Sequence, residues 1–327
     1  MKYVALKDVC KINMGQSPDS SSYNENGEGI PFFQGNADFG ERYPVTRVWC
    51  NAPTKIAQSE DILISVRAPI GALNYAKEKC CIGRGLAAIT PDKSKVSLEF
   101  VYWFLKGKNA ELKSKGTGST FKAISKKILE EILIPDVGFD KQHEYAQMLE
   151  KIYVIIQTRK QGLQKLDELI QSRFVEMFAN KGYSVLKWND VFDTTTGKLD
   201  SNAATEDGEY PFFTCSKEVL RIDKFAFNQE ALLLAGNNAA GKYDVKYYNG
   251  KFNAYQRTYV LKLKGDWSYQ LFRYQLEDKL IYLQQQSLGG LTKYLTMKIL
   301  AELDFIMPPI DSQIEFEQFV NQVDKSK

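Results

Sequence analysis

The sequence predicts an α+β protein in which two similar units of mixed α/β structure are each followed by a long helix. Two observations support this fold class. Segments of residues 1–139 recur in the same order in residues 181–310, and residues 140–180 carry apolar side chains at steps of three and four. We therefore expect one unit at 1–139, a long helix at 140–180, a second unit at 181–310 and the start of a second helix at 311–327.

The repeat is visible in matched segments that keep their order along the chain. IPFF at residues 30–33 is matched by YPFF at 210–213, and EDILI at 60–64 is matched by EALLL at 230–234. The offsets lie between 170 and 182 residues, a regularity that chance would rarely produce. Further matched pairs are 8–15 with 190–197, 127–131 with 298–302, and 140–144 with 311–315.

Within each unit the predicted elements follow one order. Runs rich in β-forming residues, such as DILISV at 61–66 and ALLLA at 231–235, are bounded by Gly, Pro and Asn and predict strands. A helical segment follows at residues 98–115 in one unit and at 268–286 in the other. A Gly-rich turn and a short apolar segment that ends in proline then lead into each long helix.

Residues 140–180 predict a single helix of roughly 40 residues, which is roughly 55 Å long at 1.5 Å per residue. The stretch contains no proline, and its one glycine is Gly162. A helix of this length cannot bury itself in one compact domain, so we interpret it as a spacer; the alternative is a core helix broken near Gly162. The seam expected to pair with another helix or subunit is Leu149, Ile152, Ile156, Arg159, Leu163, Leu166, Ile170, Arg173 and Met177.

The second helix is expected to be shortened. By its offset from the first helix, Lys327 corresponds to Ile156, so the distal part of a matching helix is missing. We expect the chain to self-associate or to require a partner subunit, because apolar positions of the first helix would lack cover. These positions are Leu163, Leu166, Ile170 and Met177.

The composition is that of an ordinary globular protein, with 44% hydrophobic and 25% charged residues among 327. The net charge of +3 neither indicates nor excludes nucleic-acid binding, because local patches decide it. The five cysteines show no CxxC spacing, which argues against a zinc site and against a disulfide scaffold. The first residues do not resemble a signal peptide, and no long apolar run occurs, so we expect a cytoplasmic protein outside membranes.

Motifs that suggest catalysis are incomplete. GNNAAGKY at 236–243 resembles a phosphate-binding loop but ends in tyrosine where Ser or Thr would hold magnesium. GRGLAA at 83–88 is followed by a proline and not by a helix, and IMPPI at 306–310 lacks the amide and aromatic residues of an amino-methyltransferase loop. His143 is the single histidine, so a catalytic triad or a histidine metal cluster is not expected. We therefore expect neither a catalytic residue nor a metal site.

Basic and polar residues concentrate at the predicted turns and indicate nucleic-acid binding. Backbone N–H groups, hydroxyls and lysines around GTGST at 116–120 can contact phosphates. Gln256 and Arg257 can each form two hydrogen bonds with a purine edge, and Tyr255 can stack on a base or contact phosphate. An ordinary solvated surface is the alternative, but the repetition in both units favours binding. The predicted DNA-contacting residues are Arg67, Arg84, Lys113, Lys115, Thr117, Ser119, Thr120, Lys122, Lys217, Lys242, Tyr255, Gln256, Arg257 and Lys293.

Taken together, these features resemble the specificity subunit of type I restriction-modification systems over essentially the whole chain. The resemblance is carried by the duplicated order, by the long helix, and by segments 30–33 with 210–213 and 116–135 with 289–308. YQR at 255–257 is similar to a common pattern of that family, whereas its counterpart, taken as Arg84-Gly85-Leu86, departs from it.

The resemblance implies two target recognition domains joined by helices that pair into an antiparallel coiled-coil spacer. It also implies sequence-specific binding to a bipartite, asymmetric target in double-stranded DNA. The two parts of such a target would lie about one helical turn, roughly 34 Å, apart.

The resemblance further implies partners that supply the chemistry. These are DNA adenine methyltransferase subunits, which use S-adenosylmethionine, and restriction subunits, which use ATP and Mg. No cofactor is expected in this chain itself. Two alternatives stay open: a truncated scaffold or decoy that binds the partner subunits, and a self-contained DNA-modifying enzyme, which methyl transfer by the isolated chain would reveal.

Overall fold

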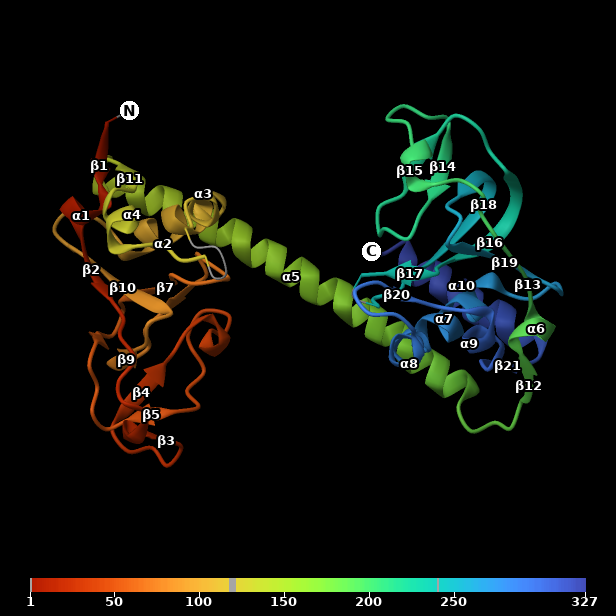
Figure 1. The fold of residues 1–327 in the computed structure, drawn as a ribbon, viewed down its shortest axis with the longest axis horizontal. Helices are drawn as coiled ribbons and strands as arrows, with labels where there is room; N and C mark the ends of the chain where they lie inside the picture. Colours follow the sequence, from red (N-terminus) through yellow and green to blue (C-terminus); the bar gives the residue numbers. More distant parts are fainter. Residues whose placement is uncertain (1, 118–121, 240) are drawn as a thin grey trace. The chain divides into compact units, whose positions relative to one another are not determined.

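The computed structural model describes residues 2–117, 122–239 and 241–327. Ser119 and Thr120 of the predicted DNA-contacting set lie outside these ranges. The chain divides into two compact units, residues 1–158 and residues 159–327, which we call unit 1 and unit 2 (Figure 1). Among the described helices, none is both long enough and apolar enough to cross a membrane.

Helix α5 (Phe139–Phe178) is a single helix of 40 residues. It continues through Gly162 without a break, which confirms the predicted long helix and rules out the alternative of a helix interrupted there. The boundary between the units falls inside α5, so its first part belongs to unit 1 and its second part to unit 2.

In the described part of unit 1, the strands form two larger sheets. One has the order β2 (Cys10–Met14), β10 (Leu86–Pro91), β7 (Ile62–Ser65) and β8 (Leu73–Tyr75), with antiparallel neighbours. The other has the order β3 (Tyr23–Asn24), β5 (Trp49–Cys50), β4 (Ile30–Phe33), β9 (Cys80–Ile82) and β6 (Ile56–Ala57), and its β4–β9 pair is parallel. Strands β1 (Tyr3–Ala5) and β11 (Leu133–Pro135) form a separate pair, and the 3-10 helices are η1 (Ser20–Ser22) and η2 (Asn36–Asp38).

The core of unit 1 lies between its first sheet and its helices. All four residues of β7 are buried, which explains why the run ILIS lacks the alternation of a half-exposed strand. Ile62, Ile89, Val101 and Leu105 are fully buried in this core, and Ala146 joins it from α5. The helices are α1 (Leu6–Val9), α2 (Leu98–Gly107), α3 (Asn109–Ser114) and α4 (Lys126–Glu130).

In the described part of unit 2, the main sheet has the order β13 (Phe192–Thr196), β19 (Thr258–Leu263), β16 (Phe227–Ala235), β18 (Val245–Ala254), β14 (Tyr210–Phe213) and β15 (Leu220–Ile222). Its β14–β18 pair is parallel, like the β4–β9 pair of unit 1. Two short pairs join β12 (Ser184–Lys187) to β21 (Asp304–Met307) and β17 (Asn237–Asn238) to β20 (Lys293–Tyr294). The helices are α6 (Trp188–Val191), α7 (Tyr269–Asp278), α8 (Leu280–Gln286), α9 (Met297–Ala301), α10 (Ile310–Asp324) and the 3-10 helix η3 (Ser201–Ala203).

A buried glutamine near the start of α5 and another near the start of α10 make equivalent hydrogen bonds. Gln142 Oε1 accepts from the N–H of Ser97 at 2.8 Å, and its Nε2 donates to a carbonyl just before α5 at 2.8 Å. Gln313 Oε1 accepts from the N–H of Ser268 at 3.1 Å, and its Nε2 donates to the carbonyl before α10 at 2.8 Å. Ser97 and Ser268 also cap α2 and α7. The duplication predicted from the sequence thus extends to individual hydrogen bonds.

The second part of α5 packs against α7 and α10 within unit 2. Ile170 and Met177 are only 7% and 8% exposed, and they join a cluster with Phe316 and Val320 of α10. The expectation that Ile170 and Met177 are exposed is therefore wrong, because α7 and the 15 residues of α10 together cover this part of α5. Of the other two positions, Leu166 is partly buried against the same cluster and Leu163 is 42% exposed.

Ion pairs fix the direction in which α5 and α10 meet. Arg173 of α5 donates to Glu176 at 2.9 Å and to Glu315 of α10 at 2.6 Å. Lys327 pairs with Asp167 at 2.8 Å. Because the later residue of α5 pairs with the earlier residue of α10, the two helices are antiparallel where they touch. One of the two arginines in the predicted seam thereby has a structural role.

Candidate nucleic-acid interface

The DNA-contacting residues predicted for unit 2 lie on loops that meet at one end of the strands of its main sheet. Backbone hydrogen bonds join these loops at 2.8–2.9 Å: Gln256 N–H donates to the carbonyl of Leu199, and Gly236 N–H donates to the carbonyl of Arg257. The antiparallel β17–β20 pair, in which Asn238 lies opposite Lys293, adds a short two-stranded sheet. We call this surface the unit 2 edge, and it comprises residues 197–200, 214–219, 236–239, 241–242, 255–257 and 288–294.

The side chains on the unit 2 edge offer varied hydrogen-bonding groups. Arg257 is exposed, and Gln256 is held in place because its Nε2 donates to Asp200 Oδ2 at 3.2 Å. An exposed guanidinium, a fixed amide, a phenol and ammonium groups can together contact phosphates and base edges. The predicted residues that this edge brings together are Lys217, Lys242, Tyr255, Gln256, Arg257 and Lys293.

Lys246 supports this edge, although no sequence pattern distinguishes it from the other lysines. Its ammonium group donates to the carbonyl of Ser216 at 2.9 Å and forms an ion pair with Asp244. The side chain is only 16% exposed. Lys246 therefore ties the loop that carries Lys217 to the start of β18 and has little surface left for a ligand.

Unit 1 builds an equivalent edge from equivalent loops. Gly83 N–H donates to the carbonyl of Phe33 at 2.8 Å, and Val66 N–H donates to the carbonyl of Gly85 at 2.9 Å. Ile124 N–H donates to the carbonyl of Val66 at 2.9 Å, next to the Thr117–Ala123 bridge, and joins this segment to these loops. We call this surface the unit 1 edge, and it comprises residues 15–18, 34–35, 66–70, 83–85, 116–117 and 122–123; of the predicted residues it carries Arg67, Arg84, Thr117 and Lys122, all of them exposed.

Hydrogen bonds also correct the predicted correspondence between the two edges. Gly83 N–H bonds to the carbonyl that ends β4, and Tyr255 N–H bonds in the same way to the carbonyl that ends β14. The carbonyl of Gly85 accepts from the N–H of Val66, the residue after β7. The carbonyl of Arg257 accepts in the same way from the N–H of Gly236, the residue after β16. The counterpart of Tyr255-Gln256-Arg257 is therefore residues 83–85, one position earlier than the Arg84-Gly85-Leu86 proposed from the sequence. Sequence comparison alone missed this, because no side chain is shared between the two turns.

Two polar residues that the sequence did not single out stand beside Arg84. Ser17 Oγ accepts from the N–H of Arg84 at 3.4 Å and shares a hydrogen bond of 2.9 Å with Gln34 Nε2. Both come from loops that are distant in sequence and reach the edge only through the sheet. On the unit 2 edge, Asp200 was missed for the same reason.

Lys113 and Lys115 lie at the end of α3, just before Thr117 of the unit 1 edge. Glu111 pairs with Lys108 and with Lys115, both at 2.7 Å. These two ammonium groups hold the pKa of the Glu111 carboxyl down at about 2. Lys115 therefore has a carboxylate that competes with any phosphate, whereas Lys113 is exposed and takes part in neither ion pair.

The incomplete catalytic motifs lie mainly in strands and turns. The described part of residues 236–243 contains β17 and a turn, and residues 83–88 lead into β10. The IMPPI segment spans the end of β21 and the first residue of α10. His143 is exposed, and its Nδ1 lies 2.9 Å from the carbonyl oxygen of Phe139 in the first turn of α5.

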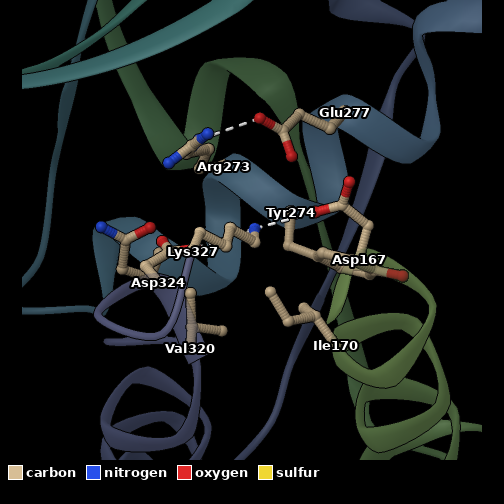
Figure 2. Close-up of a pocket in the computed structure, with 9 residues that line it drawn as sticks. Asp167, Ile170, Arg273, Tyr274, Glu277, Val320, Asp324 and Lys327 are labelled. Atoms are coloured by element: carbon tan, nitrogen blue, oxygen red, sulfur yellow. Dashed lines mark hydrogen bonds and ion pairs between the residues drawn. The ribbon is translucent and has the colours of Figure 1, made fainter. Parts of the chain in front are cut away.

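A cavity of about 320 Å³ lies between α5, α7 and α10 in unit 2. Figure 2 shows its charged side chains turned toward one another. Arg273 donates to Glu277 at 2.8 Å, and Lys327 pairs with both Asp167 and Asp324 at 2.8 Å. Because these charges are satisfied by each other, the cavity is better explained by helix packing than by ligand binding.

The family model of the type I restriction modification DNA specificity domain matches this chain twice, over residues 1–168 and 180–327. A Methanocaldococcus jannaschii protein provisionally named the type I restriction enzyme MjaX specificity subunit is 46% identical over 158 residues, which are 48% of this chain and 37% of that protein. The type I restriction enzyme EcoDI specificity subunit of Escherichia coli is 34% identical over 152 residues, which are 44% of this chain and 33% of the relative. The matches thus span about a third of the length of these curated relatives.

A solved structure is similar over nearly the whole chain. The S subunit of a type I restriction-modification system from M. genitalium aligns with a TM-score of 0.62 and covers 99% of this chain and 89% of its own. At 15% sequence identity, this likeness concerns the fold. It agrees with the predicted class of two mixed α/β units, each with a following helix.

Proposed function

Since the chain belongs to the family of type I restriction-modification DNA specificity domains, we propose that it reads DNA sequence for such a complex and has no catalytic centre of its own. The family match confirms the resemblance drawn from the sequence. The observation that carries the proposal is the edge built twice from equivalent loops, each with exposed cationic and amide side chains.

Each edge reads one part of a bipartite target in this proposal. The turns at 83–85 and 255–257 occupy equivalent places but carry different side chains, Gly-Arg-Gly in one unit and Tyr-Gln-Arg in the other. Two readers with the same backbone and different side chains suit two different base sequences. The target is therefore asymmetric.

The cationic residues around these turns divide into two roles. Lysines such as Lys122, Lys217 and Lys242 are exposed and sit on loops, so they fit phosphate contacts that hold the protein on DNA. Arg84, Gln256 and Arg257 lie on the turns and are the candidates for contacts with base edges. Binding strength then depends on salt mainly through the lysines, and sequence choice depends on the turns.

Helix α5 offers a surface for partner subunits. In its unit 1 part, Leu149, Ile152, Ile155 and Ile156 are 41–60% exposed, although they are large and apolar. Such a stripe on a helix fits a protein interface better than contact with water. We assign it to a DNA adenine methyltransferase subunit in the cytoplasm, and restriction subunits would join that complex. S-adenosylmethionine, ATP and Mg would be bound by these partners; self-association through the same stripe is the competing use.

The experiment that tests this function reconstitutes the chain with an adenine methyltransferase subunit. DNA is incubated with S-adenosylmethionine and either protein alone or both together. We expect methyl transfer at defined sites only when both are present, because one supplies sequence choice and the other chemistry. Methyl transfer by the chain alone would overturn the proposal.

A further inference from the structure

The turn at residues 83–85 of the unit 1 edge is held by backbone hydrogen bonds on both sides. Gly83 N–H donates to the carbonyl of Phe33 at 2.8 Å, and Gly85 N–H donates to the carbonyl of Gln34 at 3.1 Å. Both glycines are buried. The turn therefore has a fixed position against the end of β4.

No side chain other than that of Arg84 fits on this turn. A Cβ atom on Gly83 would lie 2.8 Å from Gln34 Oε1 and 3.0 Å from its Cα, and a Cβ atom on Gly85 would lie 2.5 Å from the Gln34 carbonyl oxygen. Contacts with backbone atoms at such distances require the chain to move. The close packing of the two glycines thus leaves a single side chain to project from the turn.

The Arg84 side chain is exposed, and its backbone is anchored. Its N–H is directed at Ser17 Oγ at 3.4 Å. The carboxylate of Asp38 in η2 accepts from the N–H groups of Gln34 and Gly35 at 2.7 Å and 3.2 Å. Among the described residues, the guanidinium of Arg84 forms no ion pair and no side-chain hydrogen bond.

We propose that Arg84 is the side chain through which unit 1 recognises a guanine in its part of the target. This inference rests on the proposed function and deepens it by naming the base. A guanidinium presents two parallel N–H donors, which match the O6 and N7 acceptors of guanine in the major groove. A fixed backbone limits the entropy lost when such a contact forms. Arg67 and Lys122 are exposed on two neighbouring segments that the Arg67–Ala123 bridge joins, and they fit contacts with phosphates near that base.

The equivalent turn of unit 2 differs in the number of side chains that it presents. It carries three side chains, and Gln256 is oriented by Asp200 at 3.2 Å. Unit 1 has one side chain at this place, so one substitution removes its reader completely. This difference makes Arg84 the cleaner test.

The test measures sequence preference with the full chain in complex with its methyltransferase subunit. The complex is bound to a library of double-stranded DNA in which the target is randomised, and the bound fraction is sequenced. The variants are Arg84→Ala, Arg84→Lys and, as a matched phosphate-contact control, Lys122→Ala. Both positions are exposed, so the thermal unfolding midpoint of each variant should equal that of the wild type.

We expect the wild-type complex to require guanine at a position in one part of the target. Arg84→Ala should reduce binding to guanine-containing sequences roughly ten- to a hundredfold and leave preferences in the other part unchanged. Arg84→Lys should recover only part of the discrimination, because an ammonium group lacks the two-pronged geometry. Lys122→Ala should weaken binding to all sequences alike.

Two results would overturn the inference. Arg84→Ala that weakens every sequence equally would assign Arg84 to phosphate, and unchanged base preferences would remove it from the interface. A wild-type complex without base preference in either part would instead contradict the proposed function, and the inference would fall with it.

Discussion

At the scale of single residues, polar side chains position the long helices and also make up the two edges that we propose bind DNA. Gln142 and Gln313 are buried and make matched hydrogen bonds that fix the start of a long helix against the start of α2 or α7. The sequence placed both glutamines in the repeat but did not predict their burial. Their roles depend on the N–H groups of Ser97 and Ser268, each 45 residues away along the chain, which local patterns do not reveal.

The cysteines provide a direct probe of the unit 2 edge. Burial raises the pKa of the thiols of Cys10 and Cys80 to about 12, whereas Cys215 is half-buried on the loop after β14. Because the thiolate is the reactive form, Cys10 and Cys80 stay unreactive in the native chain at neutral pH. We expect iodoacetamide to label Cys215 first, which mass spectrometry of the native chain would show.

DNA binding should change that labelling. If the unit 2 edge contacts DNA, a DNA fragment carrying the target slows alkylation of Cys215, because Cys215 Sγ lies 3.4 Å from the carbonyl oxygen of Arg257 on the edge. The control is a fragment with an unrelated sequence at the same salt concentration, and the denatured chain should be labelled at all five cysteines. Unchanged labelling of Cys215 at saturating target DNA would place the contact elsewhere.

At the scale of elements, the long helix was the most predictable feature. Its apolar spacing, its lack of proline and its length sufficed to define α5 to within two residues at either end. The cover over its second part was not predictable, because it depends on the three-helix contact with α7 and α10 and not on the length of α10 alone. The correspondence between the turns at 83–85 and 255–257 was also not predictable, because it is defined by hydrogen bonds that form only in the folded sheets.

Two isoleucines of α5 allow the contribution of core packing to be distinguished from the binding of a partner subunit. Ile170 is 7% exposed within the cluster against α10, and Ile156 is 46% exposed. We expect Ile170→Ala to lower the free energy of unfolding of unit 2 by about 2–4 kcal/mol, because it leaves a cavity. Ile156→Ala should change that free energy by less than about 0.5 kcal/mol.

For the affinity toward a partner subunit, we expect Ile156→Ala to have the larger effect of the two substitutions. If the exposed stripe of α5 docks the methyltransferase subunit, Ile156→Ala weakens the complex although it leaves folding intact. Urea denaturation measures the first effect, and calorimetric titration of the methyltransferase subunit measures the second. Equal affinity of wild type and Ile156→Ala would exclude this position from the interface.

At the scale of the whole molecule, duplication explains both what the sequence revealed and what it left open. Matched segments predicted two units because both need the same strands, turns and helix starts. The loops that we propose read DNA are the parts in which the units differ, so the repeat does not predict their contacts. The basic turns were recognisable as candidates, whereas Ser17, Gln34 and Asp200 entered the edges only through the folded sheets.

The central claim is that each edge reads its own part of one bipartite target. The most direct measurement is a map of adenine methylation in cells that carry this chain with its methyltransferase subunit, made for the wild type and for Arg84→Ala and Arg257→Ala. We expect a two-part asymmetric site, with Arg84→Ala relaxing a base in one part and Arg257→Ala relaxing a base in the other, each at a cost of about 1–3 kcal/mol in binding. A continuous site, or relaxation of the same part by both substitutions, would contradict the account.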